Sequence, residues 1–288
     1  MPPPFSLEYF DPPPELARHI LVLFHFATDV PRIEDLQPGA LGQFVMFPRG
    51  TGTINFGERT EHLVSRLNLM SGFSTAAPFT MDGPWHAVGM SLSPLGWAAL
   101  TGTPASEHVD QFCPAAELLG DDAALFGKDL SARYRNGEIS GRDASFAMAD
   151  WIMPRLAKVP PAHEKLIERT IIWLSGSMNP DLSLLFDTLN YSRRQAERLV
   201  EQYFGFPPAA LARKYRAVRA AALLSKERLT GHEEAAVADA FYDQPHMVRE
   251  IRRYCGYTPS RLGGDGQPIL KTLLQMKNFN RLLEFRAS

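Results

Sequence analysis

Residues 182–261 contain the same order of features twice, and this repetition constrains the fold more than any other part of the sequence. Each copy has a short apolar stretch, a turn, a longer arginine-rich stretch and a closing glycine followed by proline. The closing segments are FGFP at 204–207 and CGYTP at 255–259. A glycine just past a helix, followed by proline, is a helix stop signal. The pattern therefore predicts two helix-turn-helix units.

The first unit is expected to end in a helix over residues 193–203. Ser192 can cap this helix, because its hydroxyl can accept a hydrogen bond from a backbone N–H two or three residues on. One apolar stripe runs along the helix and consists of Ala196, Leu199, Val200 and Tyr203. The side chains left on the opposite face are Arg193, Arg194, Glu197, Arg198 and Glu201.

The second unit repeats this arrangement, with a short helix over 237–241 and Asp243 as the cap of the longer helix. The inward stripe consists of Met247, Ile251 and Tyr254. The outward side chains are Gln244, His246, Val248, Arg249, Arg252 and Arg253. Residues 208–224 are alanine-rich without an internal breaker, and they predict one rigid helix between the two units.

Residues 182–262 resemble the DNA-binding domain of the AraC family of bacterial transcription regulators. The matching segments are YSRRQ at 191–195 with Arg198, GFPP at 205–208, FYDQPH at 241–246 with Arg249, and GYTPSR at 256–261. Ala240 departs from the family, which usually has glycine there, so we expect strain or an altered geometry in the second turn. Ala196 and Ile251 replace a usual leucine and phenylalanine, which predicts a thinner core.

The resemblance implies that the longer helix of each unit enters the DNA major groove. Arginine can read guanine with two hydrogen bonds, and glutamate can accept from cytosine. In the first unit, the implied base-reading residues follow the cap residue Ser192 and are Arg193, Arg194, Glu197 and Arg198. In the second unit they are Gln244, Val248 and Arg249. The residues assigned to phosphate contact or packing are His246, Arg252 and Arg253. The alternative is a solvated helix face with intrahelical pairs such as Arg193 with Glu197.

The first 160 residues have a different character. Short strands are predicted at 21–26, at 63–73 and 87–92 around a loop at 78–84, and as two strands in 43–56. This pattern is typical of a small barrel or sandwich, and residues 93–160 predict short helices. The region resembles the sensor domains of the same family, which implies a cupin-like barrel that binds a small molecule or mediates dimerisation.

The expected fold class is therefore α+β. We expect a sensor or dimerisation domain over 1–160, divided into a barrel at 1–92 and helices at 93–160. An all-helical AraC-type DNA-binding domain with two helix-turn-helix units follows at 161–262, and a helical tail at 263–288. The boundary is placed at the proline pair 160–161.

Candidate ligand-binding residues in the first domain are Phe24, Phe26, Trp85 and His86, which could line an apolar pocket with one polar group. The alternative is that they are ordinary core residues. No metal is expected, because His25, His62 and His86 are isolated in the sequence and form no ligand pattern. The sequence has no nucleotide-binding loop or nucleophile motif, so neither a cofactor nor an enzyme is predicted.

Charge is distributed unevenly along the chain. The net charge of −2 divides into −9 over residues 1–191, +5 over 192–262 and +2 over 263–288, as expected for a basic nucleic-acid module joined to an acidic domain. The longest apolar run, 20–27, is too short to cross a bilayer, and two cysteines suit a reducing cytoplasm.

These features predict a cytoplasmic regulator that binds double-stranded DNA, responds to a small-molecule effector and can form a homodimer. The alternative is a small-molecule-binding or protein-interaction protein whose DNA-binding domain has decayed.

Overall fold

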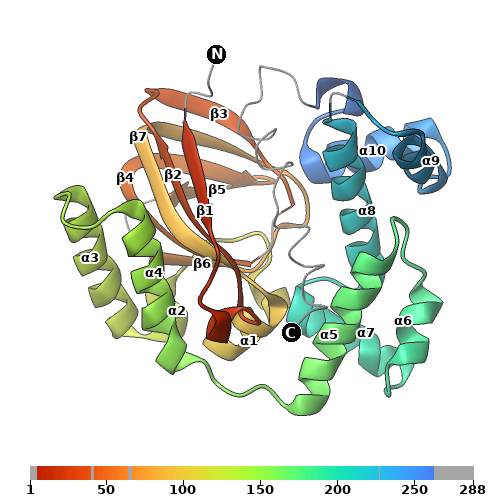
Figure 1. Cartoon of the computed structure of the whole chain (residues 1–288), viewed down its shortest axis with the longest axis horizontal. Helices are drawn as coiled ribbons and strands as arrows, with labels where there is room; N and C mark the ends of the chain where they lie inside the picture. Colours follow the sequence, from red (N-terminus) through yellow and green to blue (C-terminus); the bar gives the residue numbers. More distant parts are fainter. Residues whose placement is uncertain (1–4, 40–41, 64–66, 227, 263–288) are drawn as a thin grey trace. The chain divides into compact units, whose positions relative to one another are not determined.

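The computed structural model describes residues 5–39, 42–63, 67–226 and 228–262 (Figure 1). The chain divides into two compact units. The first, called here the sheet unit, comprises Met1–Glu34, Leu41–Gly72 and Pro78–Pro160. The second, the helical unit, comprises Asp35–Ala40, Phe73–Ala77 and Pro161–Ser288. The helix expected in the tail, at 269–285, lies outside the described residues.

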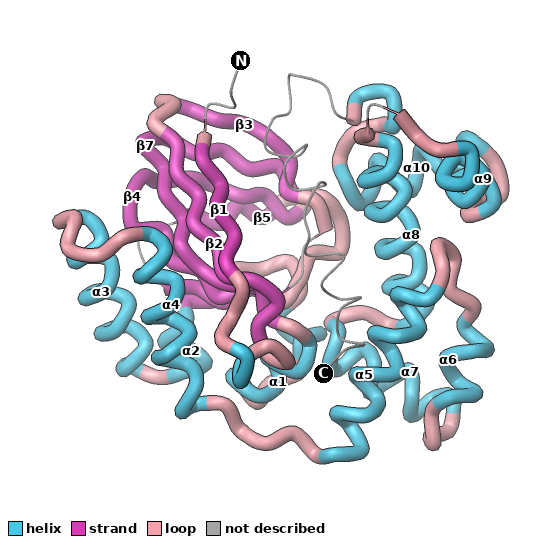
Figure 2. The backbone as a smooth tube through the Cα atoms, viewed as in Figure 1, coloured by secondary structure: helices cyan, strands magenta, loops and turns pink. Residues whose placement is uncertain are grey.

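The sheet unit is built on an eight-stranded sheet whose central path runs β1-β2-β7-β4-β6-β8, while β3 pairs with β7 and β5 with β4 (Figure 2). The antiparallel pairs are β1–β2, β2–β7, β4–β5, β4–β6, β4–β7 and β6–β8. The strands are β1 (Ser6–Phe10), β2 (Ile20–Thr28), β3 (Arg32–Gln37), β4 (Gly42–Phe56), β5 (Arg59–Leu63), β6 (Leu67–Met70), β7 (Ala77–Leu92) and β8 (Cys113–Pro114). The expected α+β class, with a strand-rich first part and a helical second part, is confirmed.

Two local expectations in this unit were wrong. Residues 43–56 form the single long strand β4, and residues 78–84 lie within strand β7 instead of forming a loop. The reason is that the two segments pair with each other along most of their length, from Gly42 opposite Leu92 to Ile54 opposite Phe79. The glycine and proline residues that suggested turns are accommodated by shifts of register between Met46 and Thr51.

Helices of the sheet unit pack on one face of the sheet. They are α1 (Pro94–Thr101), α2 (Ala115–Leu119), α3 (Asp121–Arg135) and α4 (Gly141–Ile152). Leu23, Phe44 and Met90 of the sheet form one buried core with Leu130 of α3 and Met148 of α4. Helices α2 and α3 are separate, because Gly120 adopts a positive φ of 83° between them.

The helical unit contains two successive helix-turn-helix arrangements. Its helices are α5 (Pro161–Gly176), α6 (Leu182–Thr188), α7 (Arg193–Phe204), α8 (Pro208–Leu224), α9 (Gly231–Asp239) and α10 (Gln244–Cys255). Helix α8 is the predicted connection between the two arrangements. Among the residues that the structure covers, no helix is long and apolar enough to cross a membrane.

Two short segments from earlier in the chain, Asp35–Ala40 and Phe73–Ala77, belong to the helical unit. The N–H of Gly39 donates to the carbonyl of Tyr254 at 2.9 Å, and the N–H of Ala76 donates to the carbonyl of Arg253 at 2.9 Å. Both carbonyls lie in the last turn of α10, where the helix itself offers no N–H partner. The two segments therefore cap the C-terminal end of α10.

Candidate nucleic-acid interface

Helix α7 is formed and terminated by the residues that the sequence indicated. The hydroxyl of Ser192 accepts a hydrogen bond from the N–H of Gln195 at 3.3 Å. Gly205 ends the helix in the left-handed region, with φ 79°. The predicted inward stripe is buried and consists of Ala196, Leu199, Val200 and Tyr203. This packing fixes which side of α7 faces away from the core.

The outward side of α7 carries the predicted base-reading residues. Arg193, Arg194 and Arg198 are exposed, and Glu197 is half-buried. The Nε of Arg193 lies 3.1 Å from the Oε1 of Glu197, one helical turn away. The four side chains thus lie on an accessible face directly after the turn, where a recognition helix presents its first residues to base edges.

Helix α10 repeats this construction. The carboxylate of Asp243 accepts from the N–H of His246 at 2.7 Å, and Gly256 ends the helix with φ 84°. The buried side contains Glu250, Ile251, Tyr254 and Cys255, whereas the predicted inward residue Met247 is only half-buried. The predicted outward residues that are exposed are Gln244, Arg249, Arg252 and Arg253, and those that are half-buried are His246 and Val248.

The second turn shows no backbone strain at Ala240, contrary to expectation. Ala240 is buried and right-handed, with φ −75° and ψ −18°. This region of φ/ψ space is open to any L-residue, so the position does not require glycine. The backbone conformation at position 240 therefore suits alanine as well as glycine.

One group of residues in the helical unit was not foreseen from the sequence. Arg216 of α8 and Glu250 of α10 form an ion pair of 2.7 Å, in which each side chain is only about a tenth exposed. The sequence did contain one indication that Glu250 is buried. Glu250 lies four residues before the inward Tyr254 and four after His246, and residues four apart lie on the same side of a helix.

The four candidate ligand residues of the sheet unit do not share one face. Side chains alternate along a strand, and residues opposite each other in neighbouring strands point to the same side. In the β2–β7 pair, Thr28 lies opposite Trp85 and Ala27 opposite His86. Phe24, Phe26 and Trp85 therefore share one face, and His86 lies on the other.

The face that carries Trp85 is aromatic and buried. The rings of Trp85 and Phe47 are 4.8 Å apart, and those of Phe26 and Phe5 are 5.3 Å apart. Phe24 is 9% exposed, Phe26 8% and Trp85 2%. This apolar surface can pack a hydrophobic molecule or serve as core, as the sequence left open.

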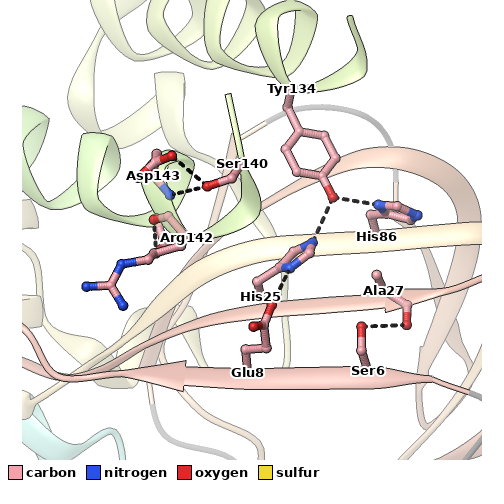
Figure 3. Close-up of polar contacts among 10 residues, drawn as sticks. Ser6, Glu8, His25, Ala27, His86, Tyr134, Ser140, Arg142 and Asp143 are labelled. Atoms are coloured by element: carbon pink, nitrogen blue, oxygen red, sulfur yellow. Dashed lines mark hydrogen bonds and ion pairs between the residues drawn. The ribbon is translucent and has the colours of Figure 1, made fainter. Parts of the chain in front are cut away.

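His86 instead belongs to a polar cluster on the helix-covered face (Figure 3). The hydroxyl of Tyr134, which points from α3 toward the sheet, lies 2.7 Å from Nε2 of His25 and 2.6 Å from Nδ1 of His86. Nδ1 of His25 lies 3.2 Å from Oε2 of Glu8. Strands β1, β2 and β7 are thereby joined to α3 through one chain of hydrogen bonds.

A carboxylate only accepts, so Nδ1 of His25 is the donor to Glu8. The Tyr134 hydroxyl can both donate and accept, and it joins the rings of His25 and His86. Burial and, after it, the positive charge of Arg49 lower the pKa of His86, which favours the neutral ring in this arrangement.

Both cysteines are free, buried thiols. Burial raises the pKa of Cys113 to about 11 and that of Cys255 to about 12, and a protonated thiol is a poor nucleophile. Over the described ranges, no three His, Cys, Asp or Glu side chains come together in a way that could hold a metal ion.

Comparisons with known proteins found a matching family model, similar sequences and a similar solved structure. Residues 185–263 match a family model described as a helix-turn-helix domain. The HTH-type transcriptional regulator GbdR of Pseudomonas aeruginosa (strain UCBPP-PA14) is 30% identical over 159 residues, which cover 52% of this chain and 40% of GbdR. The F1 operon positive regulatory protein of Yersinia pestis is 40% identical over 86 residues, 30% of this chain and 27% of that protein.

A solved structure, ToxT from Vibrio cholerae O395, aligns with 90% of this chain and 96% of its own at 8% identity and a TM-score of 0.44. The chain spans 40% of the length of GbdR.

Proposed function

We propose that this chain is a sequence-specific regulator of transcription of the AraC type that binds double-stranded DNA, and the match of residues 185–263 to a helix-turn-helix family model supports this proposal. The observation that carries the proposal is the repeated construction of α7 and α10. Each helix is capped by a side chain just after a turn, ends at a left-handed glycine and presents exposed arginines. Arginine in this position is suited to guanine and phosphate.

Helix α8 supports the use of both recognition helices on one duplex. It runs for 17 residues, or about 25 Å at 1.5 Å per residue. A continuous helix of this length separates the two recognition helices by a fixed element instead of a flexible linker. We therefore expect two contacted DNA segments in successive turns of the major groove.

An effector is assigned to the sheet unit as part of the same proposal. The aromatic face that carries Phe24, Phe26 and Trp85 suits an apolar small molecule, and the resemblance to family sensor domains also implies that a second copy of the chain can bind. The effector is tested by screening a library of small molecules for compounds that quench the tryptophan fluorescence of the protein. The quenching should be lost in Trp85→Phe. The dimer is tested by measuring the molar mass in solution by light scattering.

The central experiment is selection of bound duplexes from a random DNA pool by the full-length chain, followed by fluorescence anisotropy on the enriched sequence. A regulator is expected to enrich one motif with two conserved segments and to prefer it over scrambled DNA by 10³-fold or more, on the order of magnitude typical of specific binding. Recovery of unrelated sequences at low salt would contradict the proposal. The alternative of a decayed DNA-binding domain rests on the Ala240 departure and on the modest charge of +5 over residues 192–262. The right-handed backbone at Ala240 weakens the first of these two grounds.

A further inference from the structure

We propose that the buried pair of Arg216 and Glu250 positions α10 for sequence reading, and that His246 serves this pair instead of contacting DNA. The inference rests on the proposed function, since it concerns how the second recognition helix is held. Arg216 lies in α8 and Glu250 in α10, 34 residues apart in the sequence. Neither residue reaches the exposed face that carries Gln244 and Arg249.

Arg216 uses all three of its guanidinium nitrogens, two of them for the carboxylate of Glu250 and one for Asn179. Nε and Nη2 of Arg216 donate to Oε2 of Glu250 at 3.0 and 2.7 Å, and Nη1 donates to Oδ1 of Asn179 at 2.8 Å. The guanidinium also lies 5.2 Å above the ring of Phe241, in the turn between α9 and α10. Arg216 thus contacts the turn, the recognition helix and the segment before α6.

His246 completes the arrangement from the N-terminal end of α10. Its Nδ1 lies 3.4 Å from the backbone N–H of Tyr242, and its Nε2 lies 3.3 Å from Oε1 of Glu250. The Tyr242 amide donates to Nδ1, and Nε2 faces the Glu250 carboxylate. The same ring packs edge-on against Phe241 at 5.8 Å. Both ring nitrogens are therefore engaged within the protein, which leaves phosphate contact to the arginines.

The hydrogen bonds from Arg216 hold the carboxylate of Glu250 in place, and this fixes the rotation of α10 about its own axis. Successive residues are about 100° apart around a helix of 3.6 residues per turn, so Gln244, Val248 and Arg249 keep a constant angle to Glu250. If the carboxylate were released, a small rotation would move all three relative to the base edges. Planar donors such as guanidinium restrict orientation more than apolar contacts do, because their hydrogen bonds have preferred directions.

The decisive variant is the double substitution Arg216→Met with Glu250→Leu. Replacing both members of a buried ion pair by apolar residues of similar size often preserves stability, whereas removal of one member leaves an uncompensated charge. The matched control is Arg219→Met, which lies on the same helix and removes a bond to the carbonyl of Ser177 without touching α10. Full-length proteins are compared by thermal unfolding and by anisotropy on duplexes with single base changes.

We expect the double variant to unfold near the wild-type temperature but to lose about tenfold or more in discrimination at the base pairs read by α10, the equivalent of one base contact. Discrimination at the base pairs read by α7 should be unchanged, as should all values for Arg219→Met. If the double variant folds and keeps full discrimination in both segments, the positioning role is wrong and the proposed function stands. A wild-type chain without any sequence preference would overturn both.

Glu250→Gln provides a second measurement that does not depend on the double variant folding. The amide keeps the size of the side chain and can still accept from Arg216, but it lacks the charge. A positioning role predicts a partial loss of discrimination restricted to the α10 segment. An equal loss in both segments would indicate general destabilisation and would contradict the inference.

Discussion

Arg193 and Glu197, two of the predicted base-reading residues of α7, bind each other: Nε of the arginine lies 3.1 Å from Oε1 of the glutamate. The arginine side chain is 71% exposed and the glutamate 44%. Exposed pairs of this kind contribute about 0–1 kcal/mol, so a guanine or a phosphate can replace the glutamate at little cost. In the proposed function, the pair therefore orients the two side chains in the free protein and leaves them available to DNA.

Substitution of Glu197 by alanine tests this relationship. It removes the acceptor for cytosine and leaves Arg193 free to contact phosphate. We expect affinity for unrelated DNA to rise by about two- to threefold and preference at one base pair to fall by about 1–3 kcal/mol. Anisotropy on the selected duplex and its single-base variants measures both. A matched change at Glu201, which lies one turn farther along α7, should leave the base preference unaltered.

Arg194 and Arg253 should differ in what they contribute to binding. Arg194→Ala is expected to reduce preference at one position by about 1–3 kcal/mol. Arg253→Ala is expected to weaken all duplexes alike and to lower the slope of log affinity against log salt by about one. Titrations at four salt concentrations separate these outcomes. Equal effects of both substitutions on every sequence would show that Arg194 contacts only the backbone.

The lowered pKa of His86 predicts how stability depends on pH. Burial and Arg49 disfavour its charged form in the folded chain, so the unfolded chain takes up the proton more readily as pH falls below the ordinary value of 6.5. Stability is thus fully present above this value and falls as pH decreases through it. Urea unfolding from pH 7.5 to 5 measures the effect.

His86→Gln should flatten this part of the pH profile, because glutamine does not titrate in this range. The exposed His62 of β5 offers the matched control, and His62→Gln should keep the wild-type slope. A profile that is identical in all three proteins would show that His86 carries the same charge in the folded and unfolded states.

Substitution of Ala240 by glycine in the second turn should not stabilise the protein. Because Ala240 is right-handed, Ala240→Gly gives no relief of strain and increases the freedom of the unfolded chain. We expect a loss of about 0.5–1 kcal/mol of unfolding free energy, measured by urea denaturation. The reverse change at the left-handed Gly256, Gly256→Ala, should cost more, because the added methyl group would also collide with Leu36. Stabilisation by Ala240→Gly would mean that the turn is strained after all.

The local features of the helical unit were predictable from the sequence, and the pairing of distant segments was not. Ser192, Asp243 and the two closing glycines act within a few residues of their own position, so simple capping rules located them. The length of β4 and β7 depends on each strand pairing with the other, which no local turn signal reveals. The contact of Arg216 with Glu250 likewise requires α8 and α10 to be packed together.

The candidate ligand set shows a different kind of error. Trp85 and His86 are neighbours in one strand, and strand alternation alone separates them onto opposite faces. The partners of His86 come from β2 and α3, and Tyr134 lies 48 residues away in the sequence. The alternation of side chains along a strand could have been used to separate Trp85 from His86 in advance. The partners of His86 could not have been predicted from the sequence.

The cap that Gly39 and Ala76 place on the last turn of α10 makes the helical unit discontinuous along the chain. A truncated fragment that starts at Pro161 would retain every predicted DNA-contacting arginine and still lose the two amides that satisfy the carbonyls of Arg253 and Tyr254. The last turn of α10 in such a fragment would therefore lack these two capping hydrogen bonds.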